Sequence, residues 1–177
     1  MKKWYETSSN NSDVVLYSKA VLVRNLENTV FPSKMSDELK RSVVKKVFAC
    51  IKNSPLAQEF DLVNLTDCTK AQAMSYAEKE LISQDFLNSK SSFLLSKDED
   101  VTVMINEEDH IKITSFAPGQ NIDTAYNKAN DVDDIFINGL NISFSKKYGF
   151  LTSSPMNLGT GLKVSVALHL PALAEKG

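Results

Sequence analysis

Three consecutive carboxylates, Glu107, Glu108 and Asp109, stand between two predicted strands of this 177-residue chain. Side chains alternate between the two faces of an extended backbone, so we expect Glu107 and Asp109 to share one face and Glu108 to lie on the other. One carboxylate of such a group could orient and deprotonate a cationic nucleophile, while another anchors a magnesium-bound water. The alternative interpretation is a solvated turn between the strands.

A glycine-bearing loop later in the chain is the second candidate, because Gly159, Thr160 and Gly161 precede an apolar segment. The apolar residues within 164–170 predict a helix that Pro171 closes. A helix amino terminus presents free amides and partial positive charge to a phosphate, and Lys163 would add a cation in the first turn. The loop and the carboxylates together would supply a phosphoryl-transfer site, although the glycines could also form a simple turn.

The histidines and cysteines have structural interpretations. His110 follows the carboxylates at the start of a predicted strand, where we expect it to pack or form hydrogen bonds rather than bind a metal. His169 falls on the predicted apolar helix and is expected in the core. Cys50 and Cys68 are expected to act as small buried hydrophobic residues, and their spacing from the histidines does not match a metal site.

Hydrophobic spacing predicts the elements that position these groups. Apolar residues recur at helical intervals from Ser36, the expected N-cap, to Ile51, and further helices are predicted over 69–82 and 122–137. Strands joined by short charged turns, without regular βαβ alternation, indicate an α+β fold with an antiparallel sheet flanked by helices. The predicted strands are 60–65, 92–95, 101–105, 111–116, 141–144 and 150–152, with 14–23 either a strand or an extended segment.

Composition favours one folded unit. A chain with 42% hydrophobic and 24% charged residues can bury one core, so we predict a single domain over 1–177, with the polar residues 1–12 flexible. The net charge of -2 provides no basic field for nucleic acid or a membrane surface. No apolar run approaches the roughly 20 residues of a transmembrane helix, and no signal segment follows the amino terminus, so we expect a cytoplasmic protein.

Both motifs resemble those of one family. Residues 106–110, Asn-Glu-Glu-Asp-His, are similar to the signature of the guanidino (phosphagen) kinases, the ATP:guanido phosphotransferases. Residues 152–163 are similar to their Thr-Ser-Cys-Pro-x-Asn-x-Gly-Thr-Gly-Leu-Arg stretch. Segments 12–26, 78–83 and 168–173 also agree in order, and the resemblance is strongest to bacterial members that phosphorylate protein arginines. It implies a partial catalytic domain of the guanidino-kinase/glutamine-synthetase-like fold, Mg-ATP, an arginine-containing protein substrate and a possible homodimer.

The resemblance also implies roles for individual residues. Glu108 would be the base toward the guanidinium, with Glu107 and Asp109 supporting the substrate and magnesium. Magnesium would arrive with ATP and would have no direct protein ligand. The implied ATP-binding residues are Ser18, Lys19, Val21, Lys112, Lys163, Val164 and Ser165. The implied loop residues are Ser154, Asn157, Gly159, Thr160 and Gly161.

The chain departs from the family pattern around the phosphates. Positions that hold phosphate-binding arginines in the family are Lys19, Val21, Lys112 and Lys163 here. A lysine keeps the charge but loses the two-pronged geometry of arginine, and Val21 keeps neither. Ser154 replaces the reactive cysteine, Met156 a threonine and Glu80 a nucleotide-contacting histidine. The chain stops at Gly177, before the next nucleotide-binding segment of the family.

These observations support two function classes. The first is a divergent, partial enzyme that transfers the γ-phosphoryl group of Mg-ATP to a guanidinium, expected to be a protein arginine; the carboxylates and the Gly-Thr-Gly loop favour it. The second is a pseudokinase, a binding or regulatory module that keeps the acidic groove without turning over ATP; the lost arginines favour it. A structural remnant that binds neither ligand is a third.

Overall fold

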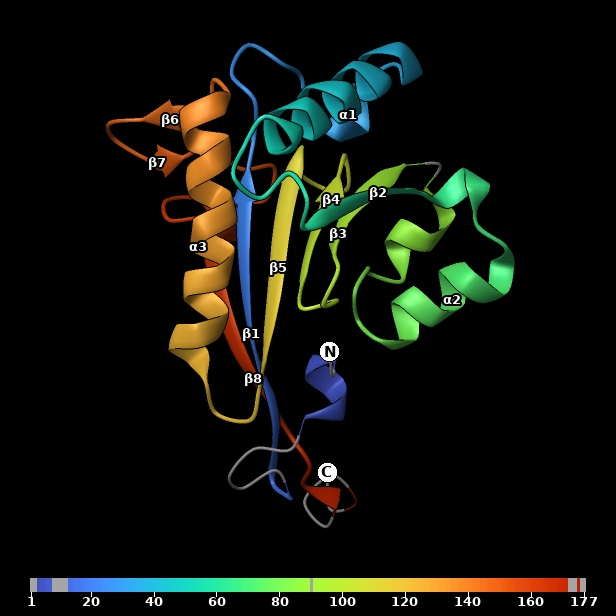
Figure 1. Ribbon diagram of the computed structural model, residues 1–177. Coiled ribbons are helices and arrows are strands. Elements are labelled where there is room, and N and C mark those ends of the chain that lie inside the picture. The colour runs from blue at the N-terminus through green and yellow to red at the C-terminus, as the bar shows by residue number, and fades with distance from the viewer. Residues whose placement is uncertain (1–2, 8–12, 90, 172–174, 176–177) are drawn as a thin grey trace.

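A six-stranded antiparallel sheet with the order β2-β3-β4-β5-β1-β8 forms the centre of the computed structural model (Figure 1). The structure describes residues 3–7, 13–89, 91–171 and 175. The strands are β1 (Val15–Arg24), β2 (Phe60–Asn64), β3 (Ser92–Ser96), β4 (Val101–Ile105), β5 (Ile111–Pro118) and β8 (Leu162–Leu168). The predicted α+β class with an antiparallel sheet is therefore confirmed.

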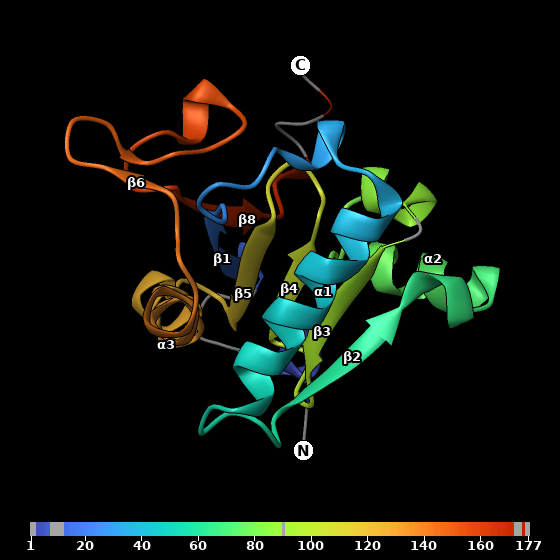
Figure 2. The same ribbon diagram turned by 90° about the horizontal axis from the view of Figure 1, so that it is seen from above.

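Two helices, α1 (Asp37–Lys52) and α3 (Ile122–Gly139), cover one face of this sheet (Figure 2). The main core lies between them and the sheet, where Val47 and Phe136 are fully buried. Burial of such apolar surface is the main source of folding free energy. Both helices were predicted, and Ser36 caps α1 as expected, because its Oγ accepts a hydrogen bond from the Leu39 amide.

The opposite face of the sheet is only partly covered. Helix α2 (Lys70–Glu78) and the 3₁₀ turn η4 (Asp85–Asn88) pack against its β3–β4 part, where Phe86 and Phe93 form a second, smaller core. The β5-β1-β8 part of this face carries polar and charged side chains and lines a cavity. The remaining short elements are η1 (Trp4–Glu6), η2 (Pro32–Lys34), η3 (Leu65–Asp67), η5 (Pro155–Asn157), β6 (Phe144–Ser145) and β7 (Gly149–Phe150).

Several sequence predictions are corrected. The segment predicted as an apolar helix after Gly161 is the strand β8, which pairs antiparallel with β1, and His169 beyond it is exposed rather than in a core. The helix predicted over 69–82 ends at Glu78, because Glu80 adopts a left-handed backbone conformation (φ 59°) that turns the chain. The strands predicted over 141–144 and 150–152 are reduced to the two-residue pair β6–β7.

The amino-terminal residues 3–7, part of the stretch predicted to be flexible, pack on the sheet. The Trp4 ring stacks on Phe116 with a centroid distance of 4.6 Å, and the Tyr5 hydroxyl donates to Glu99 at 2.9 Å. Residues 1–2 and 8–12 lie outside the described residues. Cys50 and Cys68 are free thiols and only partly buried, which differs from their predicted burial. Within the described ranges, no helix combines the length and apolar character needed to cross a membrane.

Candidate active site

A cavity of about 820 Å³ lies over the β5-β1-β8 part of the sheet. Its walls are the α2–η4 segment, the turn between β4 and β5, and the loop that precedes β8. The three carboxylates Glu107, Glu108 and Asp109 line it together. The volume falls within the range of about 300–1,000 Å³ that is usual for small-molecule sites.

The carboxylates do not alternate between two faces as predicted. Asn106 has a left-handed backbone (φ 60°), so residues 106–109 form a turn rather than an extended strand, and all three carboxylates reach the same cavity. Their environments differ, because Glu108 is exposed, Glu107 is half-buried and Asp109 is only 1% exposed. Glu108 is therefore the carboxylate of this turn that is most accessible to a ligand.

Asp109 fixes the turn to two other segments. Its Oδ1 accepts hydrogen bonds from Asn25 Nδ2 at 2.6 Å and from the Ser153 amide at 2.7 Å. Its Oδ2 is buried and has no hydrogen-bond partner among the described residues. A buried carboxylate oxygen in this state is a strong acceptor for a donor supplied by a ligand.

His110 has the structural role that the sequence predicted. Its Nδ1 accepts from the Leu26 amide at 3.1 Å, and its Nε2 lies 2.9 Å from the Val30 carbonyl oxygen. Burial lowers the pKa of His110, and this effect outweighs the opposing hydrogen bond to Val30 and the charge of Asp109. The ring is therefore neutral at neutral pH, with its proton on Nε2, and it joins β5 to the segment after β1.

Two lysines of the cavity are held by carboxylates. Lys112 Nζ lies 2.7 Å from Glu107 Oε2, while Ser83 Oγ donates to Glu107 Oε1 at 2.6 Å. Lys19 Nζ lies 3.2 Å from Glu80 Oε2. The phosphate-binding positions implied by the resemblance are therefore partly neutralised from within the chain.

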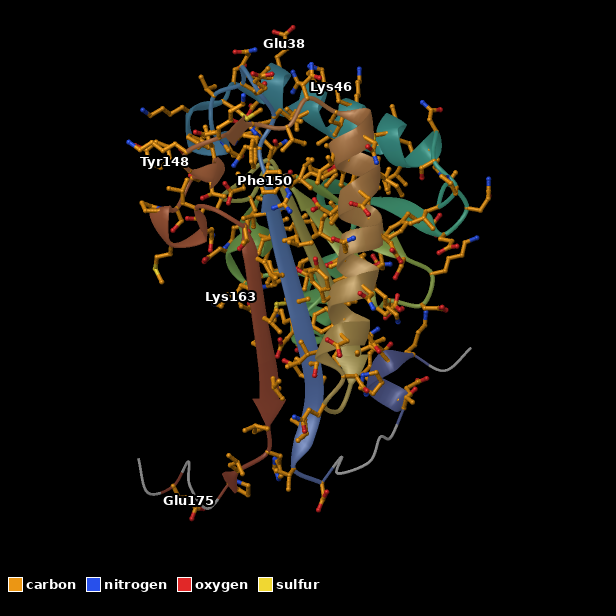
Figure 3. The ribbon with its side chains drawn as sticks, turned by 90° about the vertical axis from the view of Figure 1, so that its left-hand side faces the viewer. Glu38, Lys46, Tyr148, Phe150, Lys163 and Glu175 are labelled. Atoms are coloured by element: carbon orange, nitrogen blue, oxygen red, sulfur yellow. The ribbon has the colours of Figure 1, made fainter. Side chains whose placement is uncertain are left out.

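Strand pairing places the other cavity positions. In the β1–β8 register, Val21 lies opposite Lys163 and Lys19 lies opposite Ser165, and all four side chains line the cavity. Lys163 projects from β8 near the sheet edge (Figure 3) and has no carboxylate partner within 4 Å in the described part of the chain. Of the three lysines that line the cavity, Lys163 is thus the one best able to meet an anion.

Some predicted positions do not reach the cavity. Ser18 is buried in the opposite face, where its hydroxyl donates to the Gly119 carbonyl, and Val164 does not line the cavity. Of the predicted loop residues, the cavity lining includes Ser154, Asn157 and Gly161 but not Gly159 and Thr160. The ATP-binding role implied for Ser18 and Val164 stays a prediction.

The Gly-Thr-Gly loop does not form the phosphate cradle at a helix amino terminus that was predicted, because β8 follows it. Arg24 holds this loop instead. Its Nη1 donates to the Thr160 carbonyl at 3.0 Å, and its Nη2 lies 2.6 Å from Asp133 Oδ2 on α3. The Arg24 guanidinium also stacks on Phe150, with Cζ 3.7 Å from the ring centroid.

Three residues that support the site, Ser83, Arg24 and Asp133, were not predicted from the sequence. Ser83 lies in a segment that the resemblance covered, but only the folded structure brings it to Glu107. Arg24 is one of only two arginines in the chain, and this scarcity was the available signal for it. No local pattern marked Asp133, which is a buried acid on the core face of α3.

The fold is that of guanidino kinase catalytic domains. The substrate-free duplicated taurocyamine kinase from Schistosoma mansoni superposes with a TM-score of 0.80 at 22% identity, covering 98% of this chain and 28% of that chain. Lombricine kinase superposes with a TM-score of 0.76 at 18% identity, covering 93% of this chain and 50% of that chain. These identities establish the fold alone.

Sequence relatives define the family. The sequence model of the family described as ATP:guanido phosphotransferase, C-terminal catalytic domain, matches residues 42–177. Protein-arginine kinase from Clostridium tetani is 39% identical over 175 residues, which is 98% of this chain and 51% of that protein. Protein-arginine kinase from Bacillus pumilus is 37% identical over 178 residues, which is 98% of this chain and 49% of that protein.

The chain belongs to the ATP:guanido phosphotransferase family. The resemblance found in the acidic run and the glycine loop is thereby confirmed. The chain spans about half the length of the curated relatives it matches.

Proposed function

We propose that the protein transfers the γ-phosphoryl group of Mg-ATP to the guanidinium of a protein arginine. The observation that carries this proposal is the meeting of three carboxylates with Lys19, Lys112 and Lys163 in one cavity. Phosphoryl transfer depends mainly on positioning and on charge stabilisation, and this arrangement offers a cationic wall for phosphates and an acidic turn for a guanidinium. The names of the sequence relatives support the same acceptor.

The acidic turn supports distinct roles for its members. Glu108 is exposed to the cavity, so it would accept the guanidinium proton as the nitrogen bonds to the γ-phosphorus and the bond to the ADP oxygen breaks. Asp109 Oδ2, buried and without a partner among the described residues, would accept a second guanidinium N–H. Glu107, already paired with Lys112, would position that lysine toward the phosphates.

The residues fit Mg-ATP in charge, though not in geometry. Lysines present point charges rather than paired donors, so they can attract the phosphates without fixing their orientation. Magnesium, when bound to the nucleotide, would supply the remaining charge neutralisation. We therefore expect slow turnover and weak nucleotide affinity rather than efficient catalysis.

A comparison of Glu108→Gln with the unmodified protein tests the proposal. Labelled Mg-ATP and an arginine-rich acceptor protein are incubated with each, and acid-labile phosphoarginine is measured. We expect Glu108→Gln to lower the rate about 10²- to 10⁴-fold, the usual contribution of a positioned base. Glu38→Gln, an exposed change on α1 outside the cavity, is the matched control and should retain the rate. Equal phosphoarginine from the two variants would contradict the proposal.

A second candidate is a pseudokinase, a guanidinium-binding module without turnover. The pairing of Lys19 with Glu80 and of Lys112 with Glu107 favours it, because those lysines are then less available to phosphates. The phosphoarginine assay and calorimetric titration together separate the candidates. An enzyme should form phosphoarginine, the module should bind an arginine peptide without forming phosphoarginine, and a structural remnant should bind neither Mg-ATP nor the peptide.

A further inference from the structure

A second cavity, of about 600 Å³, adjoins the candidate active site at the end of the sheet. Glu107 and Glu108 line both cavities, so the acidic turn separates them. The other walls come from η2, the first turn of α1 and η4. A ligand in the second cavity would therefore lie beside a guanidinium held by Glu108.

The lining of the second cavity favours a hydrogen-bond donor. Asn106 lines it and is only 5% exposed. Its Nδ2 donates to the Lys40 carbonyl at 3.0 Å, whereas its Oδ1 has no partner among the described residues. A buried acceptor without a donor is energetically costly. A ligand that brings a hydrogen-bond donor into the cavity would satisfy this oxygen.

The charge of the lining favours a cation. The residues that line this cavity include three acidic ones, Asp85, Glu107 and Glu108, and one basic one, Lys40. Glu107 already pairs with Lys112. Of the other charged residues in the lining, Asp85 and Glu108 are acidic and Lys40 is basic. Asp85 is exposed and, within the described part of the chain, has no cationic partner within 4 Å.

We propose that the second cavity binds a basic side chain of the protein substrate, close in sequence to the acceptor arginine. The proposal rests on the proposed function, in which the acceptor guanidinium occupies the first cavity. Side chains two positions apart in an extended peptide leave the same side of the backbone about 7 Å apart, so they can enter adjoining cavities. Asp85 contributes the specificity and Asn106 Oδ1 accepts a hydrogen bond from the ligand.

The test uses short end-blocked peptides with one arginine and with Lys, Gln or Glu two positions before or after it. Affinity is measured by calorimetry without nucleotide, and KM and kcat are measured with Mg-ATP. We expect Lys to bind about two- to fivefold more tightly than Gln in at least one position, and Glu more weakly, the size typical of a partly exposed charge pair. Asp85→Asn should remove the preference for Lys, whereas Lys40→Gln should strengthen that preference.

The two measurements separate this proposal from the proposed function. Flank-dependent binding that Asp85→Asn abolishes, without phosphoarginine formation, would support the second cavity and count against catalysis. Phosphoarginine formed at the same KM whatever the flanking residue would support catalysis and overturn the second cavity. A preference for Glu, an unchanged preference in Asp85→Asn, or no peptide binding would also overturn it.

Discussion

Lys19 Nζ lies 3.2 Å from Glu80 Oε2 across the cavity. An acidic side chain is therefore paired with the ammonium to which the family resemblance assigns phosphate binding. Burial alone would raise the pKa of Glu80, but the Tyr17 hydroxyl and the Lys19 ammonium more than offset it, and the pKa lies below its usual value. Burial and the charge of Glu80 in turn raise the pKa of Tyr17. Glu80 is therefore ionised at neutral pH and competes with any phosphate for Lys19.

Removal of the Glu80 charge should strengthen nucleotide binding. Glu80→Gln leaves Lys19 with a neutral neighbour, and we expect Mg-ATP to bind about two- to fivefold more tightly, a modest effect because both side chains are partly exposed. Calorimetry measures the affinity. Glu78→Gln changes the net charge equally on an exposed position outside the cavity, and it should have no effect. Equal gains in both variants would show a general charge effect and refute a specific role for Glu80.

A guanidinium at position 21 should also strengthen nucleotide binding. Val21 lines the cavity opposite Lys163, so an arginine there would reach the same space and offer two parallel donors to a phosphate. We expect Val21→Arg to bind Mg-ATP about tenfold more tightly, in keeping with hydrogen bonds to a charged group. Val21→Met controls for side-chain length without charge. If both variants match the unmodified protein, phosphates do not reach this part of the cavity.

Local sequence patterns were sufficient to predict the helices and strands whose caps and hydrophobic spacing lie within a short stretch of the chain. The Ser36 cap and the helical spacing up to Ile51 predicted α1, and segments rich in Val, Ile, Thr and Phe between charged turns predicted β4 and β5. The apolar residues of β8 predicted a helix, but Val164 and Val166 fit a strand equally well. Pairing with β1 decides that segment, and such pairing is a nonlocal property.

The candidate site was predicted in its motifs but not in its internal contacts. Alternation along β1 brings Lys19 and Val21 to the cavity and sends Ser18 to the other face, which the paired register shows directly. The left-handed conformation of Asn106 brings all three carboxylates to one side, against the prediction. The Lys19–Glu80 contact joins residues far apart in the sequence, so spacing alone could not reveal it.

The buried ion pair between Arg24 and Asp133 should be important for stability. Both side chains are at most 4% exposed, and burial raises the pKa of Asp133 although the Arg24 charge opposes it. Asp133→Asn would leave the Arg24 cation buried without its counter-charge, and we expect it to lower the free energy of unfolding by about 3–5 kcal/mol. Urea denaturation measures the loss. Asp134→Asn, on the exposed side of the same helix, should change stability by less than about 0.5 kcal/mol.

Stability should depend on pH through His110. Its pKa is lower in the folded protein than in the unfolded chain, where it lies near 6.5. Between these two values the unfolded chain binds more protons, so the free energy of unfolding should fall as pH decreases below about 6.5, by at most about 1.4 kcal/mol per pH unit. Urea unfolding followed by Trp4 fluorescence at several pH values measures this slope. The carboxylates with lowered pKa values, Glu80 and Glu99, lose their contribution to stability only at lower pH.

His110→Gln should flatten the slope even if this substitution lowers stability overall, whereas His169→Gln, at an exposed position, should preserve the slope. A slope that persists in His110→Gln would mean that another group carries the proton linkage.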